Sequence, residues 1–338
     1  MKDHIHKLQN RENLTEGEII DMMKKIVSGE TPKDDMAAVL LALRAKGLTV
    51  EEITGAAKVM REFVVKIQTK HPYILDTCGT GGDKKNTFNI STATALVVAG
   101  AGCIVAKHGN RSVSSQCGSA DILESLGVNL HVEEEHLNEC LDEVGIAFLF
   151  AQKLHPAMKN VAGVRKELGV ETIFNILGPL TNPANATHQM IGVYNRDLVE
   201  PVAHVLQNLG LKRGLVVHGA DGLDEITTTA KTFISEFNGK EIQSYDISPD
   251  ELGIPLAQEE ELKGGDTVEE NVKILMDILE GDMSPRRDIV LINAAYALYI
   301  AERVENISDG LEAARQSIDR GQAKRKLEQL KEFTNRFN

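Results

Sequence analysis

The hydrophobic pattern of this sequence changes near His71-Pro72, and the change limits the folds open to it. Up to that point, apolar residues recur only at helical spacing. Beyond it, short apolar runs alternate with helical segments, a pattern typical of a mostly parallel sheet covered by helices. The runs are YILD at 73–76, CIVA at 103–106, IAFLF at 146–150, QMIGV at 189–193 and GLVVH at 214–218. We therefore expect an α/β fold in which a small all-helical domain adjoins a larger α/β domain with a mostly parallel sheet.

Three helices are expected in the first 70 residues. Capping boxes predict two of the starts, because a threonine and a glutamate three residues later satisfy amides that the first turn leaves free. The expected helices are one from the capping box of Thr15 and Glu18, one with Pro32 at its first position, and one from the capping box of Thr49 and Glu52 to about Gln68.

A second helical piece is expected inside the α/β part. It follows His155-Pro156 and leads into the Pro/Gly-rich segment 177–183, which is typical of a hinge. We expect a small helical domain over 1–70 with a second contribution from about 157–185, and a large α/β domain over 71–338. Asn238-Gly239 predicts a type I′ hairpin, and three long helices are expected around 267–280, 287–304 and 309–333.

The composition argues against several classes of partner. Fifty acidic against 37 basic residues give a net charge of −13, which disfavours nucleic acid or an anionic membrane as the main partner. No apolar run reaches the ~18 residues that a membrane span needs, and MKDHIHKLQNREN lacks the apolar core of a signal peptide. The four cysteines have neither CxxC nor metal-ligand spacing, as expected in a reducing compartment. A cytoplasmic location is the expectation.

One stretch departs from this acidic balance. From Lys84 to Ala120 there is no Asp or Glu, yet the stretch contains Lys84, Lys85, Lys107 and Arg111. An acid-free stretch with lysines, glycines and serines suits a polyanionic ligand, whereas a buried apolar segment would explain only residues 93–101.

A glycine-rich loop, GTGGD at Gly79–Asp83, lies between a predicted strand and a predicted helix. Backbone N–H groups of such a loop can bind phosphate. It is neither a Walker loop nor a dinucleotide fingerprint, since Lys84 stands where the last glycine would be. A tight turn is the alternative. Capping needs only one polar group, but the helix start offers four, which favours a bound anion: Thr87, Asn89, Ser91 and Thr92.

The segment Lys107–Ser115 follows the CIVA run, at the strand end where open α/β sheets bind ligands. Its two cations, imidazole, amide, glycine and three serines can enclose a phosphorylated sugar; a solvated loop is the alternative. Ser119 begins the next predicted helix, where it could either cap that helix or reach the same ligand.

An acidic loop, DGLDE, follows the GLVVH run. The adjacent carboxylates Asp224 and Glu225 repel each other unless they are solvated or bridged by a cation. With a phosphate substrate, oxygen ligands of this kind indicate Mg²⁺. An exposed acidic turn is the alternative.

Arg165 lies in the predicted hinge helix beside Lys166 and Glu167, where a surface role and a ligand role are both open. The sequence contains no HExxH and nothing resembling a Ser-His-Asp or Cys-His arrangement. A covalent nucleophile is therefore not expected.

Four motifs stand in the order and spacing of one enzyme family: GTGGD at 79–83, FNIST at 88–92, KHGNR at 107–111 and DGLDE at 221–225. From about Leu8 to Glu332 the sequence resembles the anthranilate phosphoribosyltransferases. The resemblance implies the fold class shared with nucleoside phosphorylases, an active site between the two domains, and a homodimer formed through the helical domain. It also implies Mg²⁺-dependent transfer of the phosphoribosyl group of phosphoribosyl diphosphate (PRPP) to anthranilate in tryptophan biosynthesis.

The resemblance further implies roles for single residues. PRPP contacts are implied for Gly79, Gly82, Asp83, Thr87, Asn89, Ile90, Ser91, Thr92, Lys107, His108, Gly109, Asn110, Arg111, Ser112, Val113, Ser114, Ser115 and Ser119. Anthranilate contacts are implied for Gly79, Asn110 and Arg165, and magnesium coordination for Ser91, Asp224 and Glu225. No general base is assigned. Lys84 replaces a glycine that many members of the family carry, which leaves the path of the loop open.

Two other interpretations remain. A pyrimidine nucleoside phosphorylase of the same fold also places a glycine loop beside a phosphate, but its second loop is not KHGNR and it does not require DGLDE. A non-catalytic, nucleic-acid-binding relative would need a basic face, against which the net charge of −13 speaks.

Overall fold

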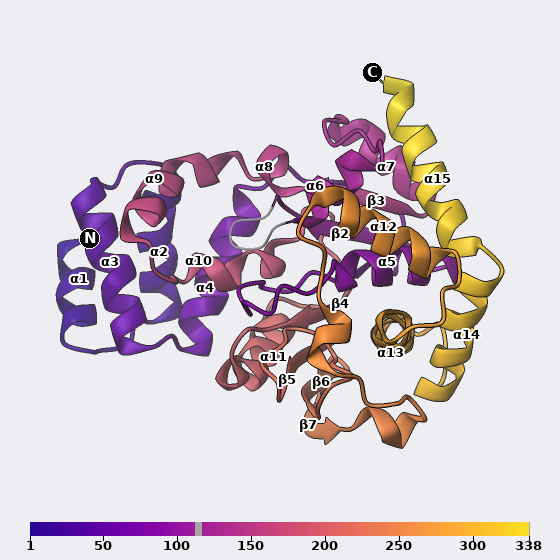
Figure 1. Ribbon diagram of the computed structural model, residues 1–338. Helices are drawn as coiled ribbons and strands as arrows, with labels where there is room; N and C mark the ends of the chain where they lie inside the picture. Colours follow the sequence, from indigo (N-terminus) through magenta and orange to yellow (C-terminus); the bar gives the residue numbers. More distant parts are fainter. Residues whose placement is uncertain (112–116, 338) are drawn as a thin grey trace.

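The computed structural model describes residues 1–111 and 117–337. A helical part and an α/β part lie side by side (Figure 1). The helical part is built of α1 (Lys2–Gln9), α2 (Glu16–Val27), α3 (Lys33–Lys46) and α4 (Val50–Glu62), together with α9 (Lys159–Leu168) and α10 (Phe174–Leu177). Helix α9 packs against α2 and α3, and α10 packs against α4. This packing supports the expected division into 1–70 with 157–185 and 71–338, which stays a prediction.

Local capping chemistry sets the starts of α2 and α4. The hydroxyl of Thr15 accepts from the N–H of Glu18 at 3.3 Å, and that of Thr49 accepts from the N–H of Glu52 at 3.2 Å, so both capping boxes are confirmed. The prediction for Pro32 was wrong by one position. Pro32 has an extended ψ of 147° and is the N-cap of α3 rather than its first residue.

Helix α4 is shorter than its sequence pattern indicates. It ends at Glu62 instead of near Gln68. The reason is tertiary, because the N–H groups of Val65 and Ile67 donate to carbonyls of Leu154 (2.9 Å) and Pro183 (3.0 Å). These bonds tie the chain after α4 to segments more than 80 residues away, and a helix cannot continue through them.

A seven-stranded sheet forms the centre of the α/β part. Its strands are β1 (Leu75–Asp76), β2 (Val105–Gly109), β3 (Ile146–Phe150), β4 (His188–Gly192), β5 (Arg213–Gly219), β6 (Thr232–Phe237) and β7 (Ile242–Ile247), in the order β3-β2-β1-β4-β5-β6-β7. The first five in this order pair in parallel, and β6 and β7 pair antiparallel at one edge. The expected fold class, with a mostly parallel sheet, is confirmed.

The remaining helices surround this sheet (Figure 1). They are α5 (Ile90–Gly100), α6 (Ser119–Ser125), α7 (Glu134–Glu143), α8 (Ala151–Leu154), α11 (Val199–Asn208), α12 (Val268–Leu279), α13 (Pro285–Ile300), α14 (Ile307–Asp319) and α15 (Gln322–Thr334). Short 3₁₀ helices lie at Pro156–Met158, Pro179–Thr181, Arg196–Leu198, Pro249–Leu252, Glu259–Leu262 and Asn335–Phe337. Across residues 1–111 and 117–337, no helix combines the length and apolar character needed to cross a membrane.

The two faces of the sheet belong to two different cores. Successive strand residues point to opposite faces, so Met190 and Leu215 enter one core while Ile191 and Val216 enter the other. The first core is shared with α5 and the C-terminal helices. The second contains α11 and, without interruption, the apolar side chains of α1–α4, α9 and α10. The helical part and the sheet are therefore joined by one continuous apolar core.

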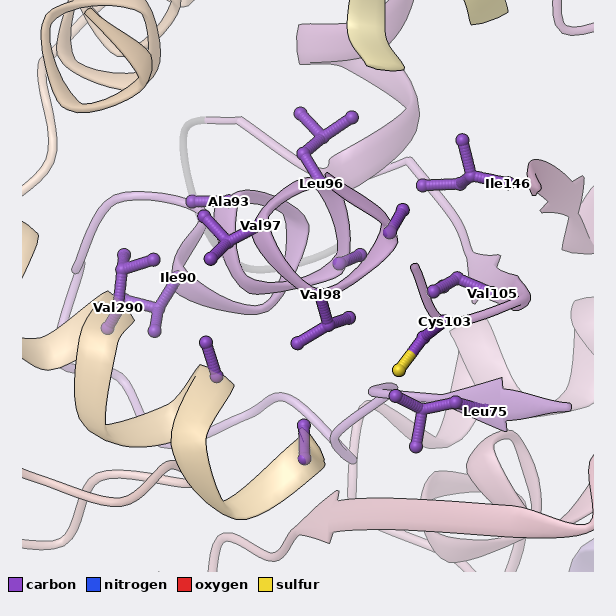
Figure 2. Close-up of a cluster of buried hydrophobic side chains, with 14 of the residues drawn as sticks. Leu75, Ile90, Ala93, Leu96, Val97, Val98, Cys103, Val105, Ile146 and Val290 are labelled. Atoms are coloured by element: carbon purple, nitrogen blue, oxygen red, sulfur yellow. The ribbon is translucent and has the colours of Figure 1, made fainter. Parts of the chain in front are cut away.

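Helix α5 is buried on all sides. Val98 of α5 points toward Leu75 of β1, and Leu96 lies on the side of Ile146 of β3 (Figure 2). Val290 belongs to α13, which packs directly against α5 in the same core. An apolar surface all round is what a fully enclosed helix requires. This packing fixes the first turn of α5 beside the glycine-rich loop.

Two C-terminal expectations were wrong in detail. The β6–β7 turn spans four residues, 238–241, and only Gly239 has a positive φ (84°), so it is not a type I′ turn. The oxygen of the Asn238 side chain accepts from the N–H groups of Lys240 and Glu241 and stabilises the longer loop. The last helix expected, around 309–333, is instead two helices, α14 and α15, separated at Gly321 with φ 67°.

Candidate active site

The candidate site lies at the carboxyl ends of four neighbouring strands. The glycine-rich loop follows β1, the KHGNR segment ends β2, Gly192 ends β4 and the acidic loop follows β5. Because the sheet order contains β2-β1-β4-β5, these four ends are adjacent. The structure thus brings the loops together at the edge that the sequence predicted.

The glycine-rich loop is held by its backbone. The N–H of Thr80 donates to the carbonyl of Gly192 at 2.9 Å, and the N–H of Gly81 donates to Oδ2 of Asp224 at 2.8 Å. Positive φ angles occur at Gly81 (65°), Gly82 (85°) and also Lys84 (59°). Lys84 therefore occupies a conformation that favours glycine, and the replacement leaves the loop able to turn.

The glycine-rich and acidic loops pack against each other without room for side chains between them. A Cβ at Gly192 would lie 1.5 Å from the backbone oxygen of Asp224. A Cβ at Gly79 would lie 2.9 Å from Oδ2 of the same residue. The two glycines therefore allow a direct contact between the glycine-rich loop and the acidic loop.

The surroundings of Asp224 and Glu225 disfavour the ionised form of both carboxyl groups. Burial, with Asp83 nearby, raises the pKa of Asp224 to about 7. Burial and the neighbouring Asp224 also raise the pKa of Glu225 well above its usual value. The ammonium group of Lys107 and the backbone N–H of Ser91 offset part of the rise at Glu225. A divalent cation would relieve this repulsion.

The donor set fits Mg²⁺ better than a metal enclosed by protein ligands. Within the described residues, no group of three or more His, Cys, Asp or Glu side chains can hold a metal ion. Mg²⁺ is usually held by one or two carboxylates together with substrate phosphates and water. Asp224 and Glu225 would supply the carboxylates. Ser91, in the first turn of α5, would supply a hydroxyl group.

The first turn of α5 offers unused polar groups. Asn89 is the N-cap but makes no side-chain cap bond, and its Nδ2 instead donates to the carbonyl of Cys117 at 3.1 Å. Its Oδ1 and the Oγ1 of Thr92 are buried and have no hydrogen-bond partner among the described residues. Thr87 forms a bridge to Lys263. Buried polar side chains left without a partner at a helix start point to a site that a ligand completes.

The end of β2 carries a buried cation next to this turn. Lys107 is only 3% exposed, and its Nζ donates to Oγ of Ser91 at 3.3 Å. His108 follows it, and its Nε2 lies 3.0 Å from Nε2 of His155, which precedes the hinge segment. Burial lowers the pKa of both imidazoles, that of His155 to about 4. Both rings are therefore neutral at neutral pH.

The last two residues of the KHGNR segment, Asn110 and Arg111, contact α6 in this structure. The guanidinium of Arg111 pairs with Asp121 (2.9 Å) and Glu124 (2.7 Å), so its charge is directed at α6 in this structure. Asn110 is exposed, and its carbonyl accepts from Oγ of Ser119 at 3.2 Å. The expected PRPP-contact residues Ser112, Val113, Ser114 and Ser115 lie outside the described residues.

Asp76, at the end of β1, was missed by sequence reasoning. Its buried carboxylate accepts from the N–H of His108 at 3.1 Å and from the side-chain amides of Asn182 (2.7 Å) and Gln189 (3.2 Å). Burial, partly offset by Lys107, raises its pKa to about 6. The only sequence signal was an acidic residue ending an apolar run. Asp76 connects the KHGNR strand to the hinge segment.

Arg165 lies on α9, in the helical part. Its guanidinium is half-buried, with Cζ 5.5 Å from the centre of the Phe174 ring, and burial lowers its pKa. Among the described residues, its side chain has no ion pair and no hydrogen bond, including to Asn110 or Gly79. A half-buried guanidinium without a carboxylate partner is costly in the free protein and well prepared for an anionic ligand.

The fold and the site define a class, a two-part glycosyl transferase. Residues 2–64 match the model of the glycosyl transferase family helical bundle domain, and residues 71–324 match that of the glycosyl transferase family a/b domain. Within that class, the chain belongs to the anthranilate phosphoribosyltransferase family. An anthranilate phosphoribosyltransferase of Acetivibrio thermocellus is 51% identical over 100% of this chain and 97% of its own length.

Solved structures agree over the whole chain. The anthranilate phosphoribosyltransferase of Thermus thermophilus has a TM-score of 0.93 and 41% identity, over 98% of this chain and 99% of its own. That of Saccharomyces cerevisiae, solved in complex with PRPP and Mg, has a TM-score of 0.91 and 28% identity, over 99% and 97%.

Proposed function

We propose that this protein transfers the 5-phosphoribosyl group of PRPP to the amine of anthranilate. The products are N-(5-phosphoribosyl)anthranilate and diphosphate, and the reaction is the second step from chorismate to tryptophan. The observation that carries the proposal is the direct contact of the glycine-rich loop with the carboxylate pair, at the 2.8 Å bond between Gly81 N–H and Asp224. Family membership supplies the substrate class.

PRPP would bind across this contact. Its diphosphate would lie on the backbone amides of Gly79, Gly82 and Asp83 and on the first turn of α5, where Asn89 and Thr92 have unpaired oxygens among the described residues. Lys107 would add a buried positive charge, and Arg111 would exchange its present carboxylate partners for phosphate only if it rotates away from α6. We infer the same role for Thr87, Ile90, His108, Gly109 and Ser119 from their place in these segments.

Asp224, Glu225 and Ser91 would hold Mg²⁺ beside the diphosphate. When bound, the ion would neutralise negative charge on the departing diphosphate. The protein's own part is to aim two carboxylates and a set of amides at one place before substrate arrives.

Anthranilate would bind on the opposite side, with its carboxylate on Arg165 and its amine near Asn110 and Gly79. A nitrogen–carbon bond forms at the ribosyl C1 as the bond to the diphosphate oxygen breaks, and the amine loses a proton. Binding and orientation of the two reactants can supply most of the rate, because no covalent step on the protein is needed.

The test follows anthranilate fluorescence in the presence of PRPP and Mg²⁺. The proposal expects a loss of fluorescence that requires both PRPP and Mg²⁺. Phosphorolysis of a pyrimidine nucleoside without any turnover of anthranilate would favour a nucleoside phosphorylase. A gel shift with single-stranded DNA, again without turnover, would favour a nucleic-acid-binding relative.

We further propose that the protein acts as a cytoplasmic homodimer associated through the helical part. Leu41 on α3 is 43% exposed and is the large apolar side chain most available there among the described residues. A second copy of the chain would cover it.

A further inference from the structure

The loop that carries Asp224 and Glu225 is fixed on both sides by side chains outside the proposed binding set. On the upstream side, Oδ1 of Asp221 accepts from the N–H of Leu223 at 3.0 Å, and its Oδ2 accepts from the hydroxyl of Thr227 at 2.7 Å. On the downstream side, the loop is held by Asn293 of α13, 67 positions further along the chain.

Asn293 pairs with both polar groups of one residue. Its Oδ1 accepts from the N–H of Ile226 at 3.0 Å, and its Nδ2 donates to the carbonyl of Ile226 at 2.8 Å. A third bond, from Nδ2 to the carbonyl of Ile289 at 2.8 Å, fixes the side chain on its own helix. The side-chain amide of Asn293 thus satisfies the backbone N–H and C=O of Ile226, as a neighbouring β-strand would do. Asn293 and Ile226 are both fully buried, so neither polar group of Ile226 could turn to water instead.

An asparagine is unexpected at this place in α13. The surrounding positions of the helix, including Ile292 and Ala294, are apolar and fully buried. A polar side chain in such a helix is costly unless its hydrogen bonds are made, and here three are made. The packing of α13 alone does not require an amide, whereas the backbone of Ile226 does.

We propose that Asn293 is a positioning residue that aims the Glu225 carboxylate. The inference rests on the proposed function, in which Glu225 holds Mg²⁺. Asn293 acts through Ile226 and contacts no substrate. The backbone of Asp224 is fixed separately by its packing on Gly192, so loss of Asn293 should disturb the Glu225 side of the pair first.

The test compares Asn293→Leu, which removes all three hydrogen bonds and keeps the branched shape of the side chain, with Asn293→Ser, which keeps one polar group. The matched control is Asn129→Leu. The amide of Asn129 also joins two backbone segments, accepting from His131 N–H (2.9 Å) and donating to the Thr334 carbonyl (3.3 Å) at the C-terminal helix. Calorimetry measures PRPP affinity without Mg²⁺ and at saturating Mg²⁺, and thermal unfolding measures the stability of each variant.

We expect Asn293→Leu to lose about 10- to 100-fold of the gain in PRPP affinity that Mg²⁺ provides, as removal of supporting partners of metal ligands does elsewhere. The affinity without Mg²⁺ should change less than about twofold, and Asn293→Ser should lie between Asn293→Leu and wild type. Excess Mg²⁺ should restore part of the turnover. Asn129→Leu should lower the melting temperature and leave the Mg²⁺ dependence unchanged.

Two results would overturn the proposal. One is an Asn293→Ser variant that is destabilised but keeps the wild-type dependence on Mg²⁺. The other is an equal loss of PRPP affinity with and without Mg²⁺. Both differ from failure of the proposed function, in which the wild-type protein itself would bind PRPP without any effect of Mg²⁺.

Discussion

Several residues of this site have ionisable side chains whose surroundings disfavour the charged form unless a ligand of opposite charge is bound. The guanidinium of Arg165 is half-buried over Phe174, with no carboxylate partner among the residues that the structure describes. Asp224 and Glu225 lie beside each other with raised pKa values. Charges of both signs are thus held ready, the cation in the helical part and the carboxylates at the sheet edge.

Replacing Arg165 tests this arrangement on the anthranilate side. A charged hydrogen bond is worth about 1.5–3 kcal/mol, so Arg165→Ala should raise the KM for anthranilate about 10- to 100-fold and change the KM for PRPP much less. Arg165→Lys should recover activity only in part, because an ammonium group cannot hold a carboxylate with two parallel bonds. Steady-state kinetics with each substrate varied in turn measures both.

The control for this experiment is Arg196→Ala. Arg196 also stacks on a ring, 3.7 Å from the centre of Phe233, but it is exposed and lies in another segment. It should leave both KM values unchanged. Equal losses for PRPP and anthranilate in Arg165→Ala would indicate a general disturbance of the hinge and contradict the assigned role.

At the scale of elements, the site depends on strand ends and on the contacts between loops. Helix α5 is enclosed by the sheet and by α13, which fixes its first turn beside the glycine-rich loop (Figure 2). The acidic loop is held by packing on β4 at Gly192 and by hydrogen bonds from α13. The chemistry lies in the loops, but the helices and strands determine where the loops meet.

Replacing Gly82 tests whether the glycine-rich loop binds the phosphate groups of PRPP. Gly82→Val should lower PRPP affinity at least about tenfold, because a branched side chain would obstruct the approach of phosphate to the backbone. Gly210→Val is the matched control, since Gly210 has nearly the same φ (82° against 85°) and equally open surroundings but lies after α11. Both variants should lose similar stability, of about 1–3 kcal/mol, from backbone strain. Unchanged PRPP affinity by calorimetry in Gly82→Val would refute a phosphate site here.

How far the sequence predicted these elements depends on the range of the interactions. The capping boxes of Thr15 and Thr49 act within one turn, and the predicted helix starts were confirmed. The predicted end of α4 was wrong, because the chain after this helix is held by hydrogen bonds to Leu154 and Pro183. The strand-end loops could be placed from motifs, but the supporting Asp76 and Asn293 could not, since their partners are distant in sequence.

The carboxylate of Asp76 should make stability depend on pH. Its pKa is about 6 in the folded protein, above the usual ~3.9 of an unfolded chain. The folded state therefore binds the proton more tightly, and this contribution to stability is present below pH ~4 and lost as pH rises through about 6. About two pKa units correspond to about 3 kcal/mol.

The measurement is urea unfolding of wild type and Asp76→Asn between about pH 4.5 and 7.5, a range that spans the folded-state pKa. Asparagine does not titrate, so the difference in unfolding free energy between the two proteins should shift in favour of Asp76→Asn as pH rises through about 6. Taking the difference cancels titration elsewhere, including that of Asp224. A difference that stays constant across this range would contradict the shifted pKa.

At the scale of the whole molecule, the helical part is not an independent unit. Its apolar core continues into α11 and one face of the sheet, so the two parts share buried side chains such as Ile191 and Val216. Arg165 from the helical part and the loops of the α/β part are therefore held in one body. The proposed homodimer would use the outer surface of the helical part.

The proposed dimer predicts a difference between two exposed leucines. Leu41→Glu on α3 should shift the protein from dimer to monomer, because a carboxylate would be buried at the interface. Leu256→Glu, in the α/β part and 57% exposed, should leave the dimer intact. Light scattering coupled to size exclusion measures the mass of each. A dimer that survives Leu41→Glu but not Leu256→Glu would place the interface elsewhere.

Gly192 has a consequence for how this family can diverge. The backbone of Asp224 fills the place that a side chain at Gly192 would take, and the Gly192 carbonyl accepts from the glycine-rich loop, so one residue joins both motifs. A duplicated gene that acquired alanine or any larger residue there would push the acidic loop away while both motifs stayed intact in its sequence. Such a copy should lose the transfer reaction yet keep its fold. Position 192 therefore offers a criterion, independent of the motifs themselves, for recognising members that have taken up another role.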